Sequence, residues 1–173
     1  MFRIIQASPS DDDIRELIKQ LDEYQQTLYP DESNHLDTIE ELTRSDVYFV
    51  AAYDKNPDSE ETTECDPGRS DAIGCGAIKY CRDDESTELY GEIKRLYVEG
   101  AARGKGISRQ LMSALELHAL ERGVGIVRLE TGIYQPEAIG LYEKMGYQKT
   151  EAFGGYSNDD PFSVFMKKEL FQN

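Results

Sequence analysis

The segment VEGAARGKGIS, residues 98–108, constrains the fold most, because it joins a predicted strand to a predicted helix through a turn with two glycines one residue apart. The first turn of a helix presents free backbone N–H groups and the positive end of the helix dipole, which together bind anions. Glycine lets the backbone approach an anion closely, and Arg103 and Lys105 add positive charge. The segment therefore indicates a site for a phosphate or pyrophosphate group, with a plain glycine turn carrying solvated basic residues as the alternative.

Two common phosphate-binding loops do not fit this segment. The dinucleotide-binding pattern G-x-G-x-x-G requires a third glycine at the position of Arg109. A Walker A loop requires glycine, lysine and serine or threonine in succession, whereas Lys105 lies between Gly104 and Gly106. What remains is a strand, a short glycine turn and the start of a helix.

Hydrophobic periodicity predicts the elements around this segment. Ser10 and Asp13 are expected to form a capping box at the start of the first helix, and Gly123 is expected to cap the end of the third. An N-terminal strand precedes the first helix. The predicted helices cover 10–29, 36–42, 107–122 and 135–146, and the other predicted strands cover 46–53, 72–81, 89–98, 125–132, 147–153 and 162–170.

The predicted order is β-αα-βββ-α-β-α-ββ, which indicates an α+β fold with mixed helices and strands. A chain of 173 residues fits one domain, 1–173, with a single core. The polar segment 54–71 carries two prolines and many acids between two predicted strands. We expect it to form a mobile acidic hairpin loop rather than a linker between domains.

The amino-acid composition argues against several classes of binding partner. The chain has 19 basic and 34 acidic side chains, a net charge of −15 that repels nucleic acid and anionic lipid, although such a surface also simply keeps a protein soluble. It lacks an apolar run near the ~20 residues of a membrane span and a signal-peptide pattern at its start. Three cysteines without C-x-x-C spacing predict reduced thiols rather than disulfides or a zinc site. We expect a cytoplasmic protein without metal, nucleic-acid or membrane partners.

The glycine segment also resembles a family signature. RGKGIS is similar to the R/Q-x-x-G-x-G/A motif of the GNAT superfamily of acyl-CoA-dependent N-acyltransferases, with Arg103 and Gly106 in register and Ser108 as a mild departure at the last small position. LETGIYQPEAIGLYEKMGYQKT resembles the strand and helix that follow in that family, so that the resemblance covers roughly residues 1–170. It implies a central mixed, mostly antiparallel sheet of about seven strands flanked by four helices, with acetyl-CoA (coenzyme A) as co-substrate.

The resemblance also implies positions that bind the co-substrate. The strand before the signature is expected to carry a bulge and to splay from the next strand, so that its backbone pairs with the pantetheine arm. Gln135 stands where many relatives carry an asparagine that contacts the cofactor, with capping of the following helix as the alternative. The residues so implied are Leu96, Tyr97, Val98, Arg103, Gly104, Lys105, Gly106, Ile107, Ser108 and Gln135.

Acyl transfer requires a neutral amine, and an alkylamine with a pKa of about 10 is protonated at neutral pH. By resemblance Glu92 is the candidate general base, acting directly or through water. The alternative is that Glu92 pairs with Lys94 or Arg95, or simply faces solvent. Tyr142 matches the family's general acid, which protonates the departing thiolate. Its place on an apolar helix stripe also fits a core aromatic residue.

In this family, the first two helices and the last hairpin usually select the acceptor. Acids and tyrosines there suit a cationic amine. The candidate residues are Tyr24, Tyr29, Glu32, His35, Tyr156, Asp159 and Asp160. We predict transfer of an acetyl group from acetyl-CoA to a primary amine of a small molecule or peptide, with an acyl-CoA-binding sensor or interaction module without turnover as the alternative. A homodimer is compatible with the sequence, since many relatives pair through their terminal strands.

Overall fold

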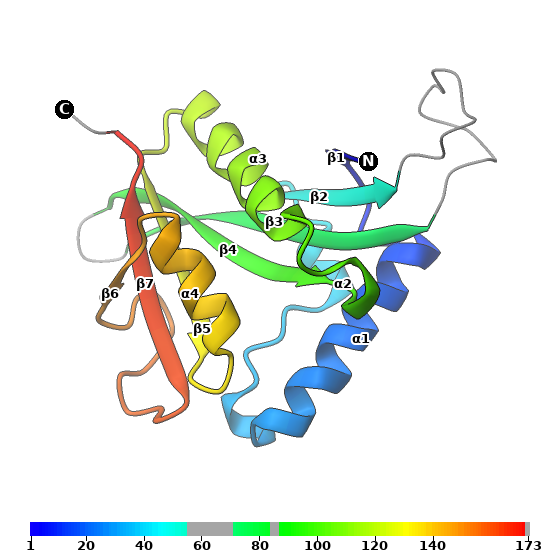
Figure 1. The fold of residues 1–173 in the computed structure, drawn as a ribbon. Helices are drawn as coiled ribbons and strands as arrows, with labels where there is room; N and C mark the ends of the chain where they lie inside the picture. Colours follow the sequence, from blue (N-terminus) through cyan, green and yellow to red (C-terminus); the bar gives the residue numbers. More distant parts are fainter. Residues whose placement is uncertain (55–70, 84–86, 172–173) are drawn as a thin grey trace.

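The computed structural model describes residues 1–54, 71–83 and 87–171 (Figure 1). Its centre is a seven-stranded sheet in the order β1-β2-β3-β4-β5-β7-β6, in which every neighbouring pair is antiparallel except β4 and β5. This confirms the predicted α+β class and the mostly antiparallel sheet. The strands are β1 (Phe2–Gln6), β2 (Val47–Asp54), β3 (Ala72–Arg82), β4 (Leu89–Val98), β5 (Ile126–Gly132), β6 (Gln148–Thr150) and β7 (Ser163–Glu169).

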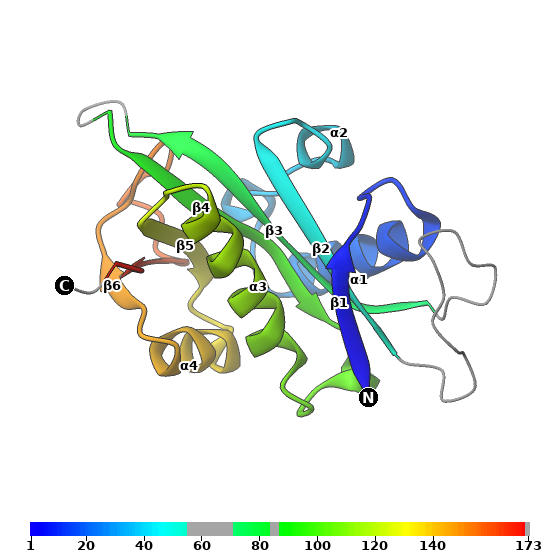
Figure 2. The same ribbon diagram turned by 90° about the horizontal axis from the view of Figure 1, so that it is seen from above.

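Four α-helices cover the two faces of the sheet, α1 and α2 on one and α3 and α4 on the other (Figure 2). Strand β2 shows how the sequence achieves this. Val50 packs in the core under α3, whereas Phe49 and Ala51 pack against α1, because successive side chains of a strand point to opposite faces. The helices are α1 (Asp12–Leu28), α2 (Ile39–Leu42), α3 (Ile107–Glu121) and α4 (Pro136–Lys144), with short 3-10 turns at Asp31–Ser33 and Gly100–Ala102.

The start of α1 differs from the prediction. Asp11 occupies the N-cap without a side-chain capping hydrogen bond, so the predicted capping box of Ser10 and Asp13 is wrong. Instead Oδ2 of Asp13 accepts a hydrogen bond of 3.2 Å from the backbone N–H of Ala72, which ties the helix to the first residue of β3. A capping box does form at α2, between Thr38 and Glu41. One oxygen of the Asp13 carboxylate thus makes a tertiary contact, while the other accepts a hydrogen bond from the backbone N–H of Ile14.

Two further differences concern the connections. Strand β6 covers only Gln148–Thr150 and is exposed, shorter than the predicted 147–153. The predicted mobile loop 54–71 lies outside the described residues except for its two ends. In the part of the chain that the structure describes, none of the helices is long and apolar enough to cross a membrane.

Candidate active site

A bulge in β4 marks the site. Between the pairs Cys75–Tyr97 and Ala77–Lys94, two steps along β3 correspond to three along β4. Arg95 lies in the extra stretch with a φ of 56°, a left-handed conformation that is unfavourable for a residue other than glycine. Strand β4 therefore bends at this point, as the resemblance led us to expect.

The side chain of Arg95 holds this bulge against the α1 face. The side chain is 6% exposed, and its guanidinium forms an ion pair with Asp22 of α1 and donates a hydrogen bond to the backbone carbonyl of Asp37. Hydrogen bonds to charged groups are stronger than neutral ones. The unfavourable backbone of Arg95 is thus offset by contacts with two segments distant in sequence.

Next to the bulge the sheet opens. Strands β4 and β5 pair only over Gly91–Val127, Glu92–Arg128 and Ile93–Leu129. Beyond these pairs both strands continue, β4 to Val98 and β5 to Gly132, without pairing to each other (Figure 1). The last part of β4 therefore has no strand partner on this side, which is the splay predicted from the resemblance.

Two adjoining cavities fill the opening. We call the larger one, of about 80 Å³, the inner cavity; it lies between β4, β5, α4 and α1. The smaller, of about 20 Å³, is the outer cavity, which is bordered by Tyr29 and Phe162. Four residues line both, so the two cavities lie next to each other. They are Gln25, His35, Glu130 and Gln135.

The glycine loop follows the free end of β4. Gly104 and Gly106 have φ angles of 77° and 79°, and a side chain built on either would meet nothing within 4 Å. Gly106 is the N-cap of α3, and the first intrahelical bond runs from the N–H of Gln110 to its carbonyl. The N–H groups of residues 107–109 are therefore free for a ligand. An open backbone with left-handed glycines before a helix start fits a pyrophosphate.

Two basic residues flank this loop. Nε of Arg103 donates a hydrogen bond of 3.0 Å to the carbonyl of Val98, and the guanidinium lies 5.8 Å from the ring of Tyr97. Lys105 is exposed. Both residues therefore place positive charge at the end of β4, where an anionic co-substrate would be held.

Tyr142 lies on α4 with its ring in the core, 5.9 Å from the ring of Tyr147, and it also lines the inner cavity. Burial, and secondarily the charge of Glu130, raises the pKa of its hydroxyl. The hydroxyl therefore remains protonated at neutral pH. The two interpretations of Tyr142, a core aromatic and a proton donor facing a cavity, are both compatible with its position.

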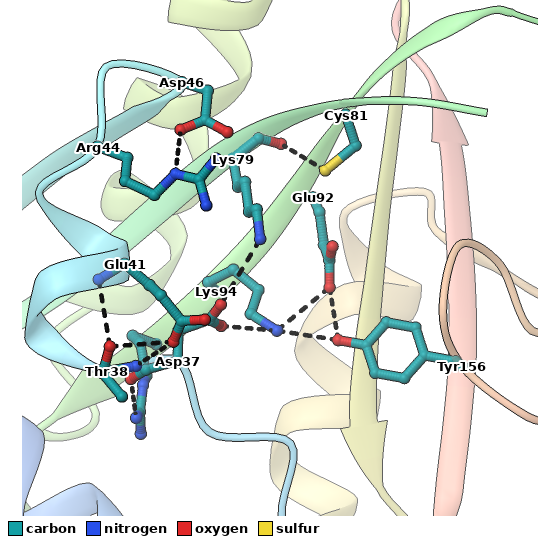
Figure 3. A network of polar contacts seen from close by, with 11 residues as sticks. Asp37, Thr38, Glu41, Arg44, Asp46, Lys79, Cys81, Glu92, Lys94 and Tyr156 are labelled. Atoms are coloured by element: carbon teal, nitrogen blue, oxygen red, sulfur yellow. Dashed lines mark hydrogen bonds and ion pairs between the residues drawn. The ribbon is translucent and has the colours of Figure 1, made fainter. Parts of the chain in front are cut away.

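Glu92 belongs to a buried polar network on the α1 face (Figure 3). Its Oε1 accepts hydrogen bonds from the hydroxyl of Tyr156, at 2.6 Å, and from Nζ of Lys94, at 3.3 Å. Lys94 also lies 2.8 Å from Oδ2 of Asp37. Glu92 is absent from the described residues that line the two cavities. The predicted pairing with Lys94 is thus present, whereas Arg95 pairs elsewhere.

Burial and neighbouring charges determine which groups of this network carry a proton. Burial lowers the pKa of Lys94, but the charges of Glu92 and Asp37 and the hydroxyl of Tyr156 outweigh this effect and raise the pKa overall. Lys94 is therefore an ammonium. Burial and the charge of Glu92 likewise raise the pKa of Tyr156, which keeps its proton and acts as a donor.

Four of the predicted acceptor residues separate into two groups, whereas Tyr156 belongs to the network of Glu92. Tyr29 is buried beside the outer cavity, and His35 lines both cavities with Nε2 3.5 Å from Oδ2 of Asp160. Tyr24 and Glu32 are exposed and are absent from the described lining. The structure therefore brings the 29–35 segment to the opening and leaves these two side chains outside it.

The sequence analysis did not identify Glu130 and Gln25, each of which lines both cavities. Glu130 lies within the LETG segment that carried the family resemblance, but strand alternation alone does not tell which face opens into a cavity. Gln25 lies on α1 among other polar residues and gave no signal. Both depend on the splay of β4 from β5, a property of the whole sheet.

Known proteins match this chain over most of its length. The model of the acetyltransferase (GNAT) family matches residues 13–147. A protein of Azospirillum brasilense named IAA acetyltransferase is 38% identical over 167 residues, 96% of this chain and 97% of that protein. A Klebsiella pneumoniae structure assigned to the acyl-CoA N-acyltransferases is 36% identical, with a TM-score of 0.73 and 99% of each chain covered.

The fold is also similar to that of Arabidopsis thaliana NAA60 in complex with acetyl-CoA, at a TM-score of 0.67 and 19% identity over 98% of this chain and 99% of that one. Among residues 1–54, 71–83 and 87–171, no group of three or more histidine, cysteine and acidic side chains could hold a metal ion. Together with the glycine loop and the splayed strands, these matches show that the chain belongs to the acetyltransferase (GNAT) family and is an acyl-CoA-dependent N-acetyltransferase that uses acetyl-CoA as co-substrate.

Proposed function

We propose that this enzyme transfers the acetyl group to a primary amine of a small molecule or peptide by direct attack of the amine on the thioester. The observation that carries this proposal is the arrangement around the free end of β4. The strand runs from the bulge at Arg95 directly into the glycine loop, and Tyr142 lines the cavity beside it. One continuous surface thus offers a backbone edge, an anion site and a proton donor.

Each part of the co-substrate has a counterpart on this surface. The edge of β4 at Leu96, Tyr97 and Val98, which has no partner in β5, would pair with the amide groups of the pantetheine arm once Arg103 releases the carbonyl of Val98. The pyrophosphate would be held by the glycine loop; its residues are Arg103, Gly104, Lys105, Gly106, Ile107 and Ser108. Gln135, the N-cap of α4, makes no capping hydrogen bond with its side chain and lines both cavities, which supports contact with the arm. The thioester would then lie in the inner cavity.

The chemistry requires two proton losses at nitrogen and one gain at sulfur. The nitrogen of an ammonium group loses one proton to bulk water before attack and a second after the new C–N bond has formed. Tyr142 is assigned the proton that the thiolate gains as the C–S bond breaks. Glu92 is assigned the second proton of nitrogen as general base, through water because it is absent from the described cavity linings.

The net negative charge of the chain supports a positively charged acceptor. A net charge of −15 attracts cations over the surface. Beside the cavities, Nε2 of His35 lies 3.5 Å from Asp160, and the two basic residues that line the inner cavity, Lys94 and Arg95, are paired with Asp37 and Asp22. We assign a cationic amine as the acceptor, and we place the reaction in the cytoplasm, where acetyl-CoA and free amines are both present.

An amine panel tests this function. The protein is mixed with acetyl-CoA and with alkylamines, polyamines, amino acids, aminoglycosides or basic peptides, and free thiol is measured with time. We expect thiol release that depends on the amine. Release independent of any amine, or binding of acetyl-CoA without release, would contradict the proposal.

Two tyrosine variants test the acid. Tyr142→Phe is expected to lower kcat about 100-fold, the lower range for loss of a general acid, with little change in acetyl-CoA affinity. Tyr147→Phe is the control: Tyr147 donates a hydrogen bond of 2.9 Å to Glu116 in the core and is absent from the described cavity linings. It should lower stability while kcat stays close to that of the unaltered protein. Equal kcat values for both variants would remove Tyr142 from the mechanism.

A further inference from the structure

One carboxylate joins the two segments that border the outer cavity. Asp160 lies in the loop between β6 and β7, and its side chain is 13% exposed. Its Oδ1 accepts a hydrogen bond of 3.2 Å from the hydroxyl of Ser33, and its Oδ2 lies 3.5 Å from Nε2 of His35. Ser33 and His35 both belong to the connection between α1 and α2. We call the side chains of Ser33, His35 and Asp160 the bridge.

Asp160 is itself held within its loop. Its Oδ1 also accepts a hydrogen bond of 2.9 Å from the backbone N–H of Phe162, whose carbonyl accepts one of 2.9 Å from the N–H of Ile133. Burial alone would raise the pKa of Asp160, but the hydrogen bonds from Phe162, Ser33 and His35 outweigh it and lower the pKa overall. Asp160 is therefore ionised at neutral pH. Hydrogen bonds to an ionised acceptor are stronger than neutral ones, so the bridge is a firm contact.

The same two segments meet at a second place, on the sheet. Nζ of Lys94 lies 2.8 Å from Oδ2 of Asp37, which belongs to the connection between α1 and α2. It also donates a hydrogen bond of 2.9 Å to the hydroxyl of Tyr156, which belongs to the loop between β6 and β7 (Figure 3). The ring of His35 packs edge-to-face on that of Tyr156, with centroids 5.0 Å apart. The two segments are thus joined both at the bridge and beside the bulge of β4.

Little space is left between the joined segments. The outer cavity, which Ser33, His35 and Phe162 help to line, measures about 20 Å³, and the inner cavity about 80 Å³. A volume of about 10–15 Å³ already corresponds to one water molecule. Most of the described side chains around the outer cavity are polar. A short polar group fits this space, whereas a polypeptide passing between the segments would have to separate Asp160 from Ser33 and His35.

The charge of the chain does not make this distinction. A net charge of −15 attracts a basic peptide as well as a small cation. Selection between two acceptors of the same charge therefore requires an element that obstructs one of them. The bridge is such an element, because it closes the gap through which a main chain would run.

We propose that Asp160 is a specificity-determining residue: by joining the loop between β6 and β7 to the connection between α1 and α2, it restricts the acceptor to free small polar amines and excludes amines carried by a polypeptide. This inference rests on the proposed function and narrows its acceptor from a small molecule or peptide to a small molecule.

Matched substrates test the acceptor class. 1,4-Diaminobutane carries the same four-carbon amine arm as a lysine side chain, without a main chain. The peptide probes are alanine–lysine–alanine blocked at both ends, and trialanine with a free N-terminus. Thiol release should give the unaltered enzyme a kcat/KM for 1,4-diaminobutane at least about tenfold above that for either peptide. An equal or higher value for a peptide would overturn the acceptor class.

The variants are Asp160→Ala and, as the control, Asp159→Ala. Asp159 is exposed, so the control removes the same charge one position away from the bridge. Asp160→Ala should raise the ratio of kcat/KM for the blocked peptide to that for 1,4-diaminobutane about tenfold, because a hydrogen bond to a charged group no longer has to be broken. Asp159→Ala should keep the ratio, and calorimetry should show unchanged acetyl-CoA affinity in both. An equal fall for both substrates in Asp160→Ala would show a merely structural role and overturn the proposal.

Two further measurements do not depend on the folding of Asp160→Ala. The double variant Ser33→Ala/His35→Ala opens the bridge from its other side, leaves the hydrogen bond between Asp160 and Phe162 in place, and should change the ratio in the same direction. Amide hydrogen exchange of residues 30–38, followed by mass spectrometry, should be faster in this variant than in the unaltered protein or Asp159→Ala. Unchanged exchange would show that the bridge does not hold the segment, and would overturn the proposal.

The exchange experiment also separates the two levels of inference. If the unaltered enzyme releases no thiol with any amine, the proposed function fails, and the acceptor specificity fails with it even where exchange shows an intact bridge. If thiol is released but the ratio is the same in all variants, only the role of Asp160 fails, and the acetyltransferase function stands.

Discussion

The hydroxyl of Tyr156 donates a hydrogen bond of 2.6 Å to Oε1 of Glu92, across 64 positions of sequence. This bond joins the loop between β6 and β7 to the centre of the sheet. It also links a residue predicted to bind the acceptor to the residue predicted to act as base (Figure 3). A double-mutant cycle tests whether the two act as a unit.

Tyr156→Phe should lower the free energy of unfolding by about 1.5–3 kcal/mol, the range for a hydrogen bond to a charged group. Glu92→Gln should also be destabilising, because it leaves the Lys94 ammonium with less compensation. Since the two variants remove the same contact, the loss in the double variant should be smaller than the sum. Urea unfolding of the four proteins measures this difference. Strict additivity would show that the contact contributes nothing in solution.

Substitution in the glycine loop should weaken co-substrate binding. Gly106→Val places a β-branched side chain at a φ of 79° and beside the N–H groups of α3. We expect acetyl-CoA affinity, measured by calorimetry, to fall more than about tenfold, because the loop must rearrange and its anion approach is obstructed.

The matched control is Gly140→Ala in α4, where an added methyl group meets nothing within 4 Å. It should preserve affinity and stabilise the helix by about 0.5–1 kcal/mol. Equal affinities for the two variants would argue against the glycine loop as the pyrophosphate site.

A side chain added at Gly132 should change the shape of the outer cavity. A Cβ atom at this position would lie 2.0 Å from the hydroxyl oxygen of Tyr29, which accepts a hydrogen bond from the backbone N–H of Tyr134. Gly132→Ala must therefore displace Tyr29, at an expected cost of about 1–3 kcal/mol in stability. KM for the amine should rise while acetyl-CoA affinity is kept. Gly155→Ala, with open space around it, should leave both unchanged, and identical amine kinetics in the two variants would place the acceptor elsewhere.

His118 should make stability depend on pH. Its ring stacks on Tyr48 at 3.6 Å, and its Nδ1 lies 2.6 Å from the hydroxyl of Tyr80. Burial, and then the charge of Arg122, lowers the pKa of His118 below its usual 6.5. The unfolded chain therefore binds a proton at higher pH than the folded chain. The stabilisation is present above about pH 6.5 and is lost as the pH falls through the lower folded value.

Urea unfolding of the unaltered protein and His118→Phe between about pH 7.5 and 5.5 measures this effect. The advantage of the unaltered protein in unfolding free energy should decline as the pH falls. A constant difference across the range would show that His118 does not titrate differently in the two states.

The sequence predicted the order of the elements and the sheet class because each depends on local patterns. Strand alternation in β2, the apolar stripe of α3 and the glycines after Val98 are all contained in short windows. The capping box at Ser10 failed for the opposite reason. The position of Asp13 in the sequence suits a capping box, but its carboxylate accepts a hydrogen bond from the backbone N–H of Ala72, 59 positions away.

The sequence by itself pointed to the family and the co-substrate, and it predicted an anion site in the glycine loop, since a strand, a glycine turn and a helix start favour anion binding. Only the tertiary structure decided which carboxylate faces the opening. The carboxylate of Glu92 accepts hydrogen bonds from Lys94 and Tyr156, whereas Glu130 lines the cavities where β4 separates from β5. That difference arises because the bulge at Arg95 and the end of parallel pairing depend on contacts between segments that lie far apart in the chain.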